Sequence, residues 1–230
     1  IFSAGITQIN ILVGTIIASF QTGAVSYLYY ADRIYQINLA IAGIAVGTVV
    51  LPNLSKKIKE NDKNSINILQ NKSLELSLAL SLPAAFGLFI ASKEIVSSLF
   101  GYGSFTQDDV ANTSLALMYF ALGVPAFALI KVLSSFYFAR DNTKIPFYIS
   151  FLSMITNVFI SVVFFKEYGF IIIPISTTFS SWLSVIIYFI FFNRSKLIIF
   201  ENKTLKNIYK ILFATTLMCF FLYLGLEYFE

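Results

Sequence analysis

The stretch SYLYYADRIYQINLAIAGIAVGTVVL at Ser26–Leu51 decides the class of fold. Its only charged residues are Asp32 and Arg33, and no charge follows them until Lys56. An apolar-rich run of about 18 residues or more is long enough to cross the hydrocarbon core of a bilayer as a helix. The stretch therefore predicts a transmembrane helix with two charged side chains inside it.

Further hydrophobic segments of this kind flank the stretch on both sides. They are Ile1–Phe20, Leu74–Ala91, Val110–Phe138, Ile145–Phe165, Phe170–Phe192 and Ile211–Leu226. Their apolar residues run continuously, which favours helices over the alternating strands of a transmembrane barrel. Pro52 is expected to close the second helix, and Asn53–Lys72 is expected to form a short surface helix or a plain loop.

The composition agrees with a membrane protein and excludes several other classes. Of the 230 residues, 57% are hydrophobic and only 12% are charged, about half the charged share of a soluble domain. We therefore predict an all-α polytopic membrane protein and exclude a disordered chain, a fibre and a disulfide-rich secreted module. Histidine is absent, which excludes imidazole-based acid–base catalysis and zinc sites. We expect no metal site and no cofactor.

Lysine and arginine concentrate in alternate connections between the segments. One set comprises Lys56, Lys57, Lys59, Lys63, Arg140, Lys144, Arg194, Lys196, Lys203, Lys206 and Lys210, and the other set only Lys93 and Lys166. Such an excess marks the cytoplasmic side of a membrane protein. The net charge of +4 is thereby explained by cytoplasmic loops, and nucleic acid is not an expected partner. Membrane lipid is one: an anionic surface would attract the basic stretch Lys203–Lys210, although control of the topology is the favoured role of these charges.

Asp32 and Arg33 are the strongest candidates for a functional site. An arginine in lipid costs roughly 2.5 kcal/mol or more, so it should face a cavity or a partner. One interpretation is an anion-binding cation in a central cavity, since the guanidinium fork suits phosphate oxygens. The other is that Arg33 snorkels outward while Asp32 caps a helix end or forms a structural pair.

Helical periodicity extends this candidate site along the same segment. At steps of three and four residues, Arg33 shares a stripe with Gln36, Ala40, Gly43 and Gly47. The Gly43-x-x-x-Gly47 spacing is a signal for close helix packing. Lys131, late in the fourth segment, has two interpretations: it snorkels to the cytoplasmic interface, or it is a second cation facing the cavity.

Three stretches resemble the MurJ (MviN) lipid II flippase family. They are SFQTGAVSYLYYADRIYQINLAIAGIAVGTVVLPNLS at Ser19–Ser55, LFGYGSFTQDD at Leu99–Asp109 and ALGVPAFALIKVLSSFYFARDNTKIP at Ala121–Pro146. The resemblance implies a fold of the multidrug/oligosaccharidyl-lipid/polysaccharide exporter type, built from two six-helix lobes and two extra helices. It implies a chain made of the second lobe, 1–192, a cytoplasmic basic connection, 193–210, and the first extra helix, 211–230, which we expect to be truncated.

The same resemblance implies the activity and the partners. The family moves the undecaprenyl-pyrophosphate-linked peptidoglycan precursor, lipid II, from the inner to the outer leaflet of the bacterial cytoplasmic membrane. Cavity arginines are thought to engage the pyrophosphate, and Arg33 matches the one in the second lobe. Asp32, Gln36 and Lys131 complete the expected substrate-binding set, and the first lobe of the same protein is an expected partner.

The sequence departs from some relatives at a sodium site. Those relatives use acidic residues, one in the first segment and one four residues after an asparagine of the fifth. Here Gly14 and Ser161 stand at those places, the latter after Asn157. A sodium site of that design is therefore not expected, and protons or the membrane potential stay open as driving forces.

Two other functions compete with lipid II transport. A related exporter of another polyprenyl-linked sugar or of a small molecule would share the fold. An integral membrane enzyme would need a carboxylate pair, metal ligands or a nucleophile with its base at membrane depth, and Asp32 is the only carboxylate well inside a segment. We therefore predict a transporter rather than an enzyme.

Overall fold

The computed structural model describes residues 2–195 and 197–229, all of them in helices and their connections. Three residues lie outside the described part of the chain: Ile1, Lys196 and Glu230. The predicted segments, basic connections and domain limits include them. The elements are α1 (Phe2–Ala18), α2 (Ala24–Leu39), η1 (Ala40–Ala45), α3 (Val46–Lys59), α4 (Lys63–Ile90), α5 (Ser92–Phe100), α6 (Gln107–Ala121), α7 (Val124–Phe138), α8 (Lys144–Tyr168), η2 (Gly169–Ile171), α9 (Ile172–Ser195) and α10 (Asn202–Phe229).

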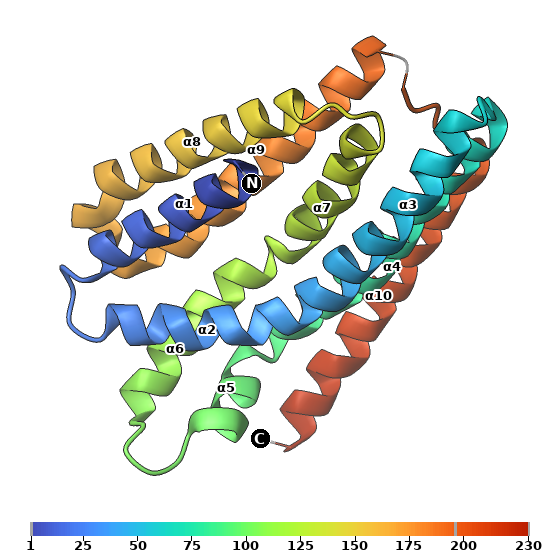
Figure 1. The fold of residues 1–230 in the computed structure, drawn as a ribbon. Coiled ribbons are helices and arrows are strands. Elements are labelled where there is room, and N and C mark those ends of the chain that lie inside the picture. Colours follow the sequence, from blue (N-terminus) through green and yellow to red (C-terminus); the bar gives the residue numbers. More distant parts are fainter. Residues whose placement is uncertain (1, 196, 230) are drawn as a thin grey trace.

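Each predicted hydrophobic segment overlaps one or more of these helices. Among the described residues, four helical stretches are long and apolar enough to cross a membrane, or five when the bent pair α6–α7 is counted. One of the four, Lys144–Ser195, contains both α8 and α9, which fold back on each other at η2 (Figure 1). The prediction of an all-α chain with several membrane-spanning helices is confirmed.

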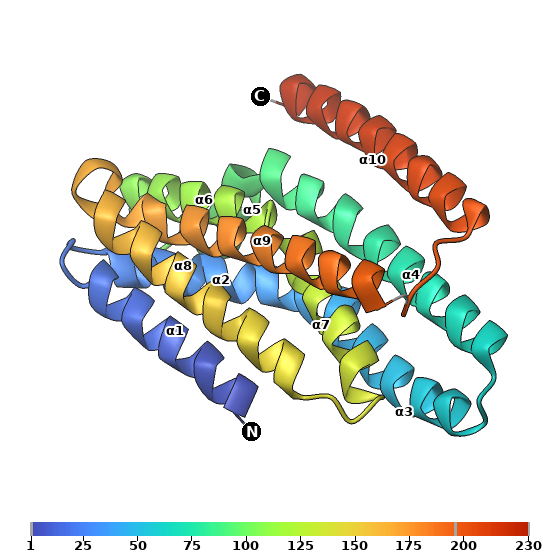
Figure 2. The ribbon, with the colours of Figure 1, turned by 90° about the horizontal axis from the view of Figure 1, so that it is seen from above.

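The helices are arranged around a central α7 (Figure 1). Helices α1, α8 and α9 lie on one side of it, and α3 and α4 lie on the other. The view from above places α10 at the edge of the molecule, beside α4 (Figure 2). Buried apolar side chains form two core clusters, one around Tyr35 and Phe120 and the other around Leu133 and Phe192.

The predicted end of the second segment at Pro52 is wrong. Helix α3 continues through Pro52 to Lys59, and α4 already begins at Lys63. The predicted surface helix or loop at Asn53–Lys72 is therefore the end of one long helix and the start of the next. Proline is tolerated inside membrane helices because neighbouring groups satisfy the freed carbonyl.

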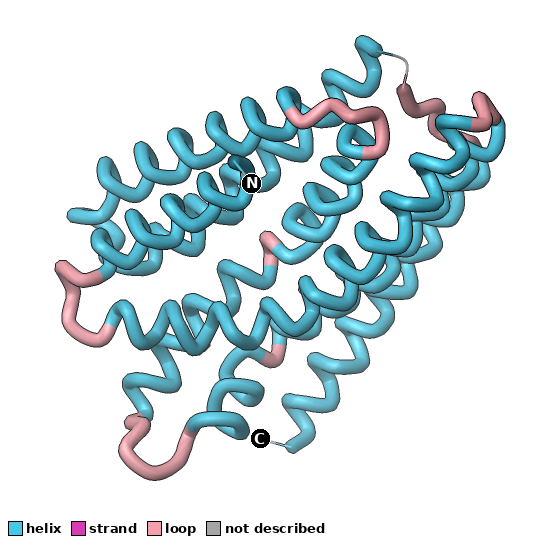
Figure 3. The backbone as a smooth tube through the Cα atoms, viewed as in Figure 1, coloured by secondary structure: helices cyan, strands magenta, loops and turns pink. Residues whose placement is uncertain are grey.

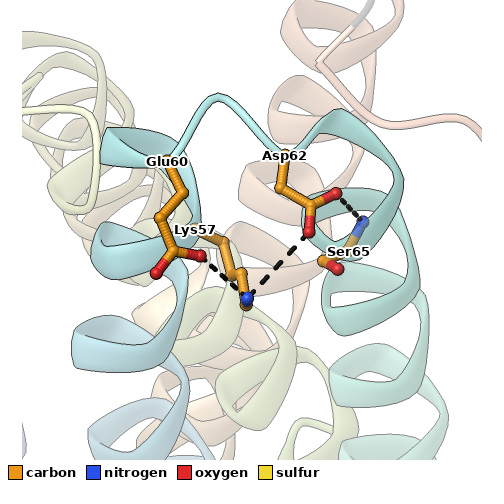
Figure 4. Close-up of polar contacts among 4 residues, drawn as sticks. All are labelled: Lys57, Glu60, Asp62 and Ser65. Carbon is orange, nitrogen blue, oxygen red and sulfur yellow. Dashed lines mark hydrogen bonds and ion pairs between the residues drawn. The ribbon is translucent and has the colours of Figure 1, made fainter.

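Polar contacts stabilise the turn between these two helices (Figure 4). Asp62 caps α4 by accepting a hydrogen bond from the Ser65 backbone N–H at 3.0 Å, as is common for the residue before a helix. Hydrogen bonding by Ser65 lowers the pKa of Asp62. The Lys57 ammonium lies 2.8 Å from a Glu60 carboxylate oxygen and 3.9 Å from one of Asp62.

The bend between α6 and α7 is stabilised from α9. The two helices meet at 42°, so carbonyl groups near the break lose their helical partners. The Thr178 hydroxyl donates to the Tyr119 carbonyl at 2.8 Å, and the Trp182 indole N–H donates to the Leu122 carbonyl at 3.0 Å. A Cβ on Gly123 would lie 2.7 Å from the Thr178 hydroxyl oxygen, so this close approach needs glycine.

Polar side chains of α4 form hydrogen bonds to the connection between α9 and α10 and hold it against α4. Asn71 donates to the Ile199 carbonyl at 2.9 Å and accepts from the Glu201 N–H at 3.4 Å. With its amide oriented to satisfy both contacts, the buried Gln70 donates to the Leu197 carbonyl at 3.0 Å and accepts from the Arg140 guanidinium at 3.2 Å. Helix α10 begins at Asn202, so the basic stretch Lys203–Lys210 lies in its first turns rather than in the connection.

Close packing at the Gly43-x-x-x-Gly47 signal is confirmed. A Cβ on Gly43 would lie 3.0 Å from the Ala128 Cα of α7, and one on Gly47 would lie 3.2 Å from the Ser135 hydroxyl oxygen. The predicted stripe is wrong in one respect. Residues Ala40–Ala45 form the π-helical η1, which turns less per residue than an α-helix. Accordingly Arg33 is exposed and Gly43 is buried.

We expect Gly43→Ala to destabilise the protein by about 1–3 kcal/mol, because the added methyl meets the α7 backbone and overpacks the contact. Gly87→Ala in α4 is the matched control, since a Cβ there meets nothing within 4 Å. Thermal unfolding of the purified protein in one detergent measures both variants. Equal melting temperatures for the two variants would contradict the close contact between η1 and α7.

The connections between the long helices gather at two opposite ends of the molecule (Figure 3). The turns after α3 and α7 and the connection before α10 share one end. The connections around Gln21–Gly23 and Gly101–Thr106 share the other. This grouping is the one that the charge pattern requires, since the first three are the lysine- and arginine-rich connections.

We expect single cysteines at Asn61 and Asn202 to be labelled from the cytoplasm and one at Ser104 from outside. All three positions are exposed, and the reporters need a background without the native Cys219. A membrane-impermeant maleimide added to intact cells, compared with permeabilised cells, makes the measurement. Labelling of Asn61→Cys in intact cells would reverse the predicted orientation.

Candidate functional site

Helix α2 presents Arg33 at the surface of the described chain. The guanidinium carbon lies 4.7 Å from the centre of the Tyr29 ring, a cation–π contact that supports an arginine away from bulk water. Tyr29 is itself 53% exposed and packs edge-on against Tyr30. Arg33 is therefore held from one side by an aromatic ring and is open on the other.

Asp32 lies about 100° around the helix from Arg33, and the two opposite charges interact without forming an ion pair. Its carboxylate accepts a hydrogen bond from the Gln36 amide one turn later, and it also interacts with the Tyr35 hydroxyl. Tyr35 is buried against Phe120 and Phe127, with ring centres 4.9 and 5.4 Å away. Asp32 and Gln36 thus form a neighbouring polar pair fixed to the core.

Arg33 interacts with the charge of Asp32 but forms no ion pair in the described part of the chain. Within residues 2–195 and 197–229, both ion pairs are made by Lys57. An unpaired guanidinium keeps its full fork of donors for an external anion. The geometry therefore suits binding of a phosphate or another doubly coordinating anion at this helix.

Lys131 does not join this group. It lies on α7, and its carbonyl oxygen is 3.5 Å from the position of a Cβ on Gly47. Gly47 follows Arg33 by 14 residues, which is about 20 Å along a helix. Lys131 is exposed and lines a groove of about 940 Å³ between η1, α3, α7 and α8. Of the four predicted substrate-binding residues, Asp32 and Gln36 touch each other, Arg33 lies beside them on α2, and Lys131 lies apart.

A second polar cluster joins α1, α8 and α9. The Asn157 amide nitrogen donates to the Asn10 side-chain oxygen and the Thr177 hydroxyl, both at 3.2 Å. Its oxygen accepts from Ser176 at 2.6 Å and from Ser161 at 3.2 Å, and the two serine oxygens are 2.7 Å apart. The cluster is neutral and its members satisfy one another. In the described part of the chain, no group of three or more cysteine, aspartate or glutamate residues is placed to hold a metal ion.

Sequence reasoning missed the wall of the groove that faces Lys131. The sequence marks Lys144 only as a topology signal and gives Tyr148 no distinguishing pattern, yet both line the groove with Lys131. The α8 residues lie more than ten positions from Lys131 in the sequence, so no local periodicity relates them. Only the packing of α8 beside α7 brings them together.

Comparison with known proteins identifies the family to which this arrangement belongs. The family model described as "Lipid II flippase MurJ" matches residues 1–230. The "Probable lipid II flippase MurJ" of Rickettsia prowazekii is 37% identical over 216 residues, which are 94% of this chain and 43% of that protein. The protein of the same name from Rhizobium meliloti is 40% identical over 187 residues, or 81% of this chain and 35% of that one.

Solved structures show the same relation. The structure described as "Lipid II flippase MurJ, inward closed conformation" superposes with a TM-score of 0.84 at 29% identity, over 97% of this chain and 46% of that one. An outward-facing multidrug resistance MATE transporter of the MOP superfamily has a TM-score of 0.73 at 17% identity, over 90% of this chain and 48% of that one. The latter likeness is one of fold alone.

The chain thus spans less than half the length of the curated relatives it matches. The family model matches residues 1–230, which include the YYADR stretch that carries Arg33. The match over the whole of residues 1–230, together with the superposition, decides its membership: the chain belongs to the lipid II flippase MurJ family, a family of membrane transporters.

Proposed function

We propose that this chain is the second six-helix lobe, with one additional helix, of a flippase that moves lipid II from the inner to the outer leaflet. The support is the family match over all 230 residues and the superposition on half of a lipid II flippase. The whole protein would lie in the bacterial cytoplasmic membrane, and the lobe that completes the transport path would be the partner of this one.

The observation that carries the mechanism is the exposed Arg33, which forms no ion pair in the described residues. Its guanidinium would engage the pyrophosphate of the substrate through paired, charge-assisted hydrogen bonds. Between transport cycles, the Tyr29 ring would stabilise the Arg33 guanidinium through their cation–π contact. Translocation of lipid II by the reconstituted full-length protein, with and without Arg33, is the test.

Asp32 and Gln36 would act beside Arg33 rather than on the same atoms. Their mutual hydrogen bond and the buried Tyr35 fix this turn of α2 to the core. The Gln36 amide would donate hydrogen bonds to the sugar or peptide part of the headgroup, and the Asp32 carboxylate would accept them. The negative charge of Asp32 would repel an anion that approaches this turn of α2 without contacting the Arg33 guanidinium.

Alternating access would bring the substrate to Arg33 from one side and release it to the other. Such transporters rock one helical bundle against a second around a central site. The cluster around Asn157 ties α1, α8 and α9 together, which would let these three helices move as one body.

We expect transport to be indifferent to replacement of sodium by potassium or choline at constant membrane potential. The positions at which some relatives carry carboxylates hold Gly14 and Ser161, and the Asn157 and Ser161 oxygens already bond to their neighbours. Sodium prefers hard, charged oxygen ligands. Translocation in proteoliposomes with a clamped potential makes the measurement, and a large saturable sodium dependence would reveal a site built from other oxygens.

A further inference from the structure

The connection between α5 and α6, residues 101–106, packs against the turn of α2 that precedes Arg33. It lies at the end of the molecule opposite the lysine- and arginine-rich connections (Figure 3). Phe100, the last residue of α5, and Phe105 of the connection have ring centres 6.1 Å apart. Both rings contact Tyr30 of α2, with centres 4.8 and 5.4 Å away, and the Phe105 ring meets the Tyr30 ring at 90°. Tyr30 is therefore half-buried in an aromatic cluster whose other members come from α5 and the connection.

The start of α6 holds this connection in place. The Thr106 hydroxyl accepts a hydrogen bond from the Asp109 N–H at 3.2 Å, and the Asp109 carboxylate accepts one from the Thr106 N–H at 2.8 Å. The same carboxylate interacts with the Tyr27 hydroxyl, about one turn before Tyr30 on α2. The backbone beside Phe105 is thus fixed to α6, and α6 is joined to α2 at a second point.

The ring contacts continue through Tyr29 to Arg33. The Tyr29 and Tyr30 rings meet at 79° with centres 5.9 Å apart, an edge-to-face arrangement that aromatic pairs prefer. Tyr29 is more than half exposed, so its contact with Tyr30 limits the positions that its ring can take. The Arg33 guanidinium carbon lies 4.7 Å from the centre of the Tyr29 ring. An unbroken series of ring contacts therefore leads from the α5–α6 connection to the guanidinium.

We propose that the α5–α6 connection orients Arg33 for the anion that it binds, with Phe105, Tyr30 and Tyr29 as positioning residues. The inference rests on the proposed function, since it assigns how the anion-binding arginine is held. A free arginine side chain has many rotamers, and ordering it in advance reduces the entropy that binding would otherwise lose. Contact with the face of a ring restrains the guanidinium while its N–H donors stay available to the anion.

Initial rates of translocation by the full-length protein in proteoliposomes, measured against the mole fraction of lipid II, test this role. We expect Tyr29→Leu and Phe105→Leu each to raise the apparent KM about fivefold and to change the maximum rate less than twofold. A less ordered arginine binds more weakly but keeps its charge. Loss of folded protein would instead lower the maximum rate and leave the KM unchanged. Tyr102→Leu is the matched control, because Tyr102 is an aromatic residue of the same connection that is 71% exposed, and it should change neither constant.

Two comparisons test whether the connection acts through Tyr29. A variant that combines Tyr29→Leu with Phe105→Leu should have the KM of Tyr29→Leu alone, because the series of contacts is already broken at Tyr29. Tyr30→Phe keeps the ring and should restore most of the affinity that Tyr30→Leu loses. Multiplied effects in the combined variant, or an unchanged KM in Phe105→Leu while transport still depends on Arg33, would overturn the inference and leave the proposed function standing.

Chemical modification of Arg33 by phenylglyoxal tests the same contacts without transport. We expect the modification rate of Arg33, relative to that of the exposed Arg194 in the same molecule, to rise about threefold in Phe105→Leu, as release from a cation–π contact predicts. Mass spectrometry of the two peptides makes the measurement. An unchanged ratio would overturn the positioning role whether or not the protein moves lipid. A raised ratio in a protein whose translocation is independent of Arg33 would overturn the proposed function and leave the positioning of Arg33 standing.

Discussion

Replacement of Arg33 by alanine in the full-length protein should lower lipid II translocation by about 100-fold or more, because a bidentate, charge-assisted contact of about 3 kcal/mol corresponds to a factor of that size. The side chain is exposed and its described contact is the Tyr29 ring. Its loss should therefore leave insertion and folding intact. Translocation in proteoliposomes at matched protein content measures the effect.

Two further variants test whether the loss of transport is specific to the guanidinium of Arg33. Arg33→Lys keeps the charge and loses the planar fork, so it should restore transport only in part. Arg194→Ala is the matched control, since Arg194 is also exposed but lies in the last turn of α9, and it should transport normally. Wild-type rates in Arg33→Ala would reduce this arginine to a structural role.

The positions of the helices could be predicted because, in a membrane protein, lipid rather than a protein core supplies the apolar environment around each helix. A membrane helix must satisfy its backbone within itself and present apolar side chains all round, so each one leaves a long run of such residues in the sequence. Pro52 is different, because a proline that would end a soluble helix lies inside α3, which continues to Lys59. The π-helical η1 could not be predicted either, because the residues of such a turn, Gly43 among them, carry no distinctive local pattern.

The candidate site was predictable only in its local part. The charges of Asp32 and Arg33 stand out because charge is costly at membrane depth, and their divergence follows from helix geometry. The contact of Asn71 with Ile199, and the placement of Lys131 and Lys144 along one groove, are different in kind. They depend on how separate helices pack, and a single sequence records no periodicity between such positions.

A second large effect is expected when residues 1–230 are produced alone. Alternating access around a central site needs two bundles, and this chain corresponds to less than half of the relatives it matches. Without the other bundle, the exposed Arg33 would face lipid or detergent, at a cost of roughly 2.5 kcal/mol or more. We expect the piece to insert into the membrane and to translocate no lipid II.

The measurement is the accessibility of lipid II at the outer leaflet of cells depleted of their own flippase. The full-length protein is the positive control. Co-expression of the piece with the other half of the same protein should restore part of the activity, because the two bundles would cover each other's polar faces. Insertion of the piece without activity, and activity with its partner, would together show that the transport path lies between the bundles. Full activity from residues 1–230 alone would instead mean that one bundle with Arg33 suffices, which alternating access between two lobes does not permit.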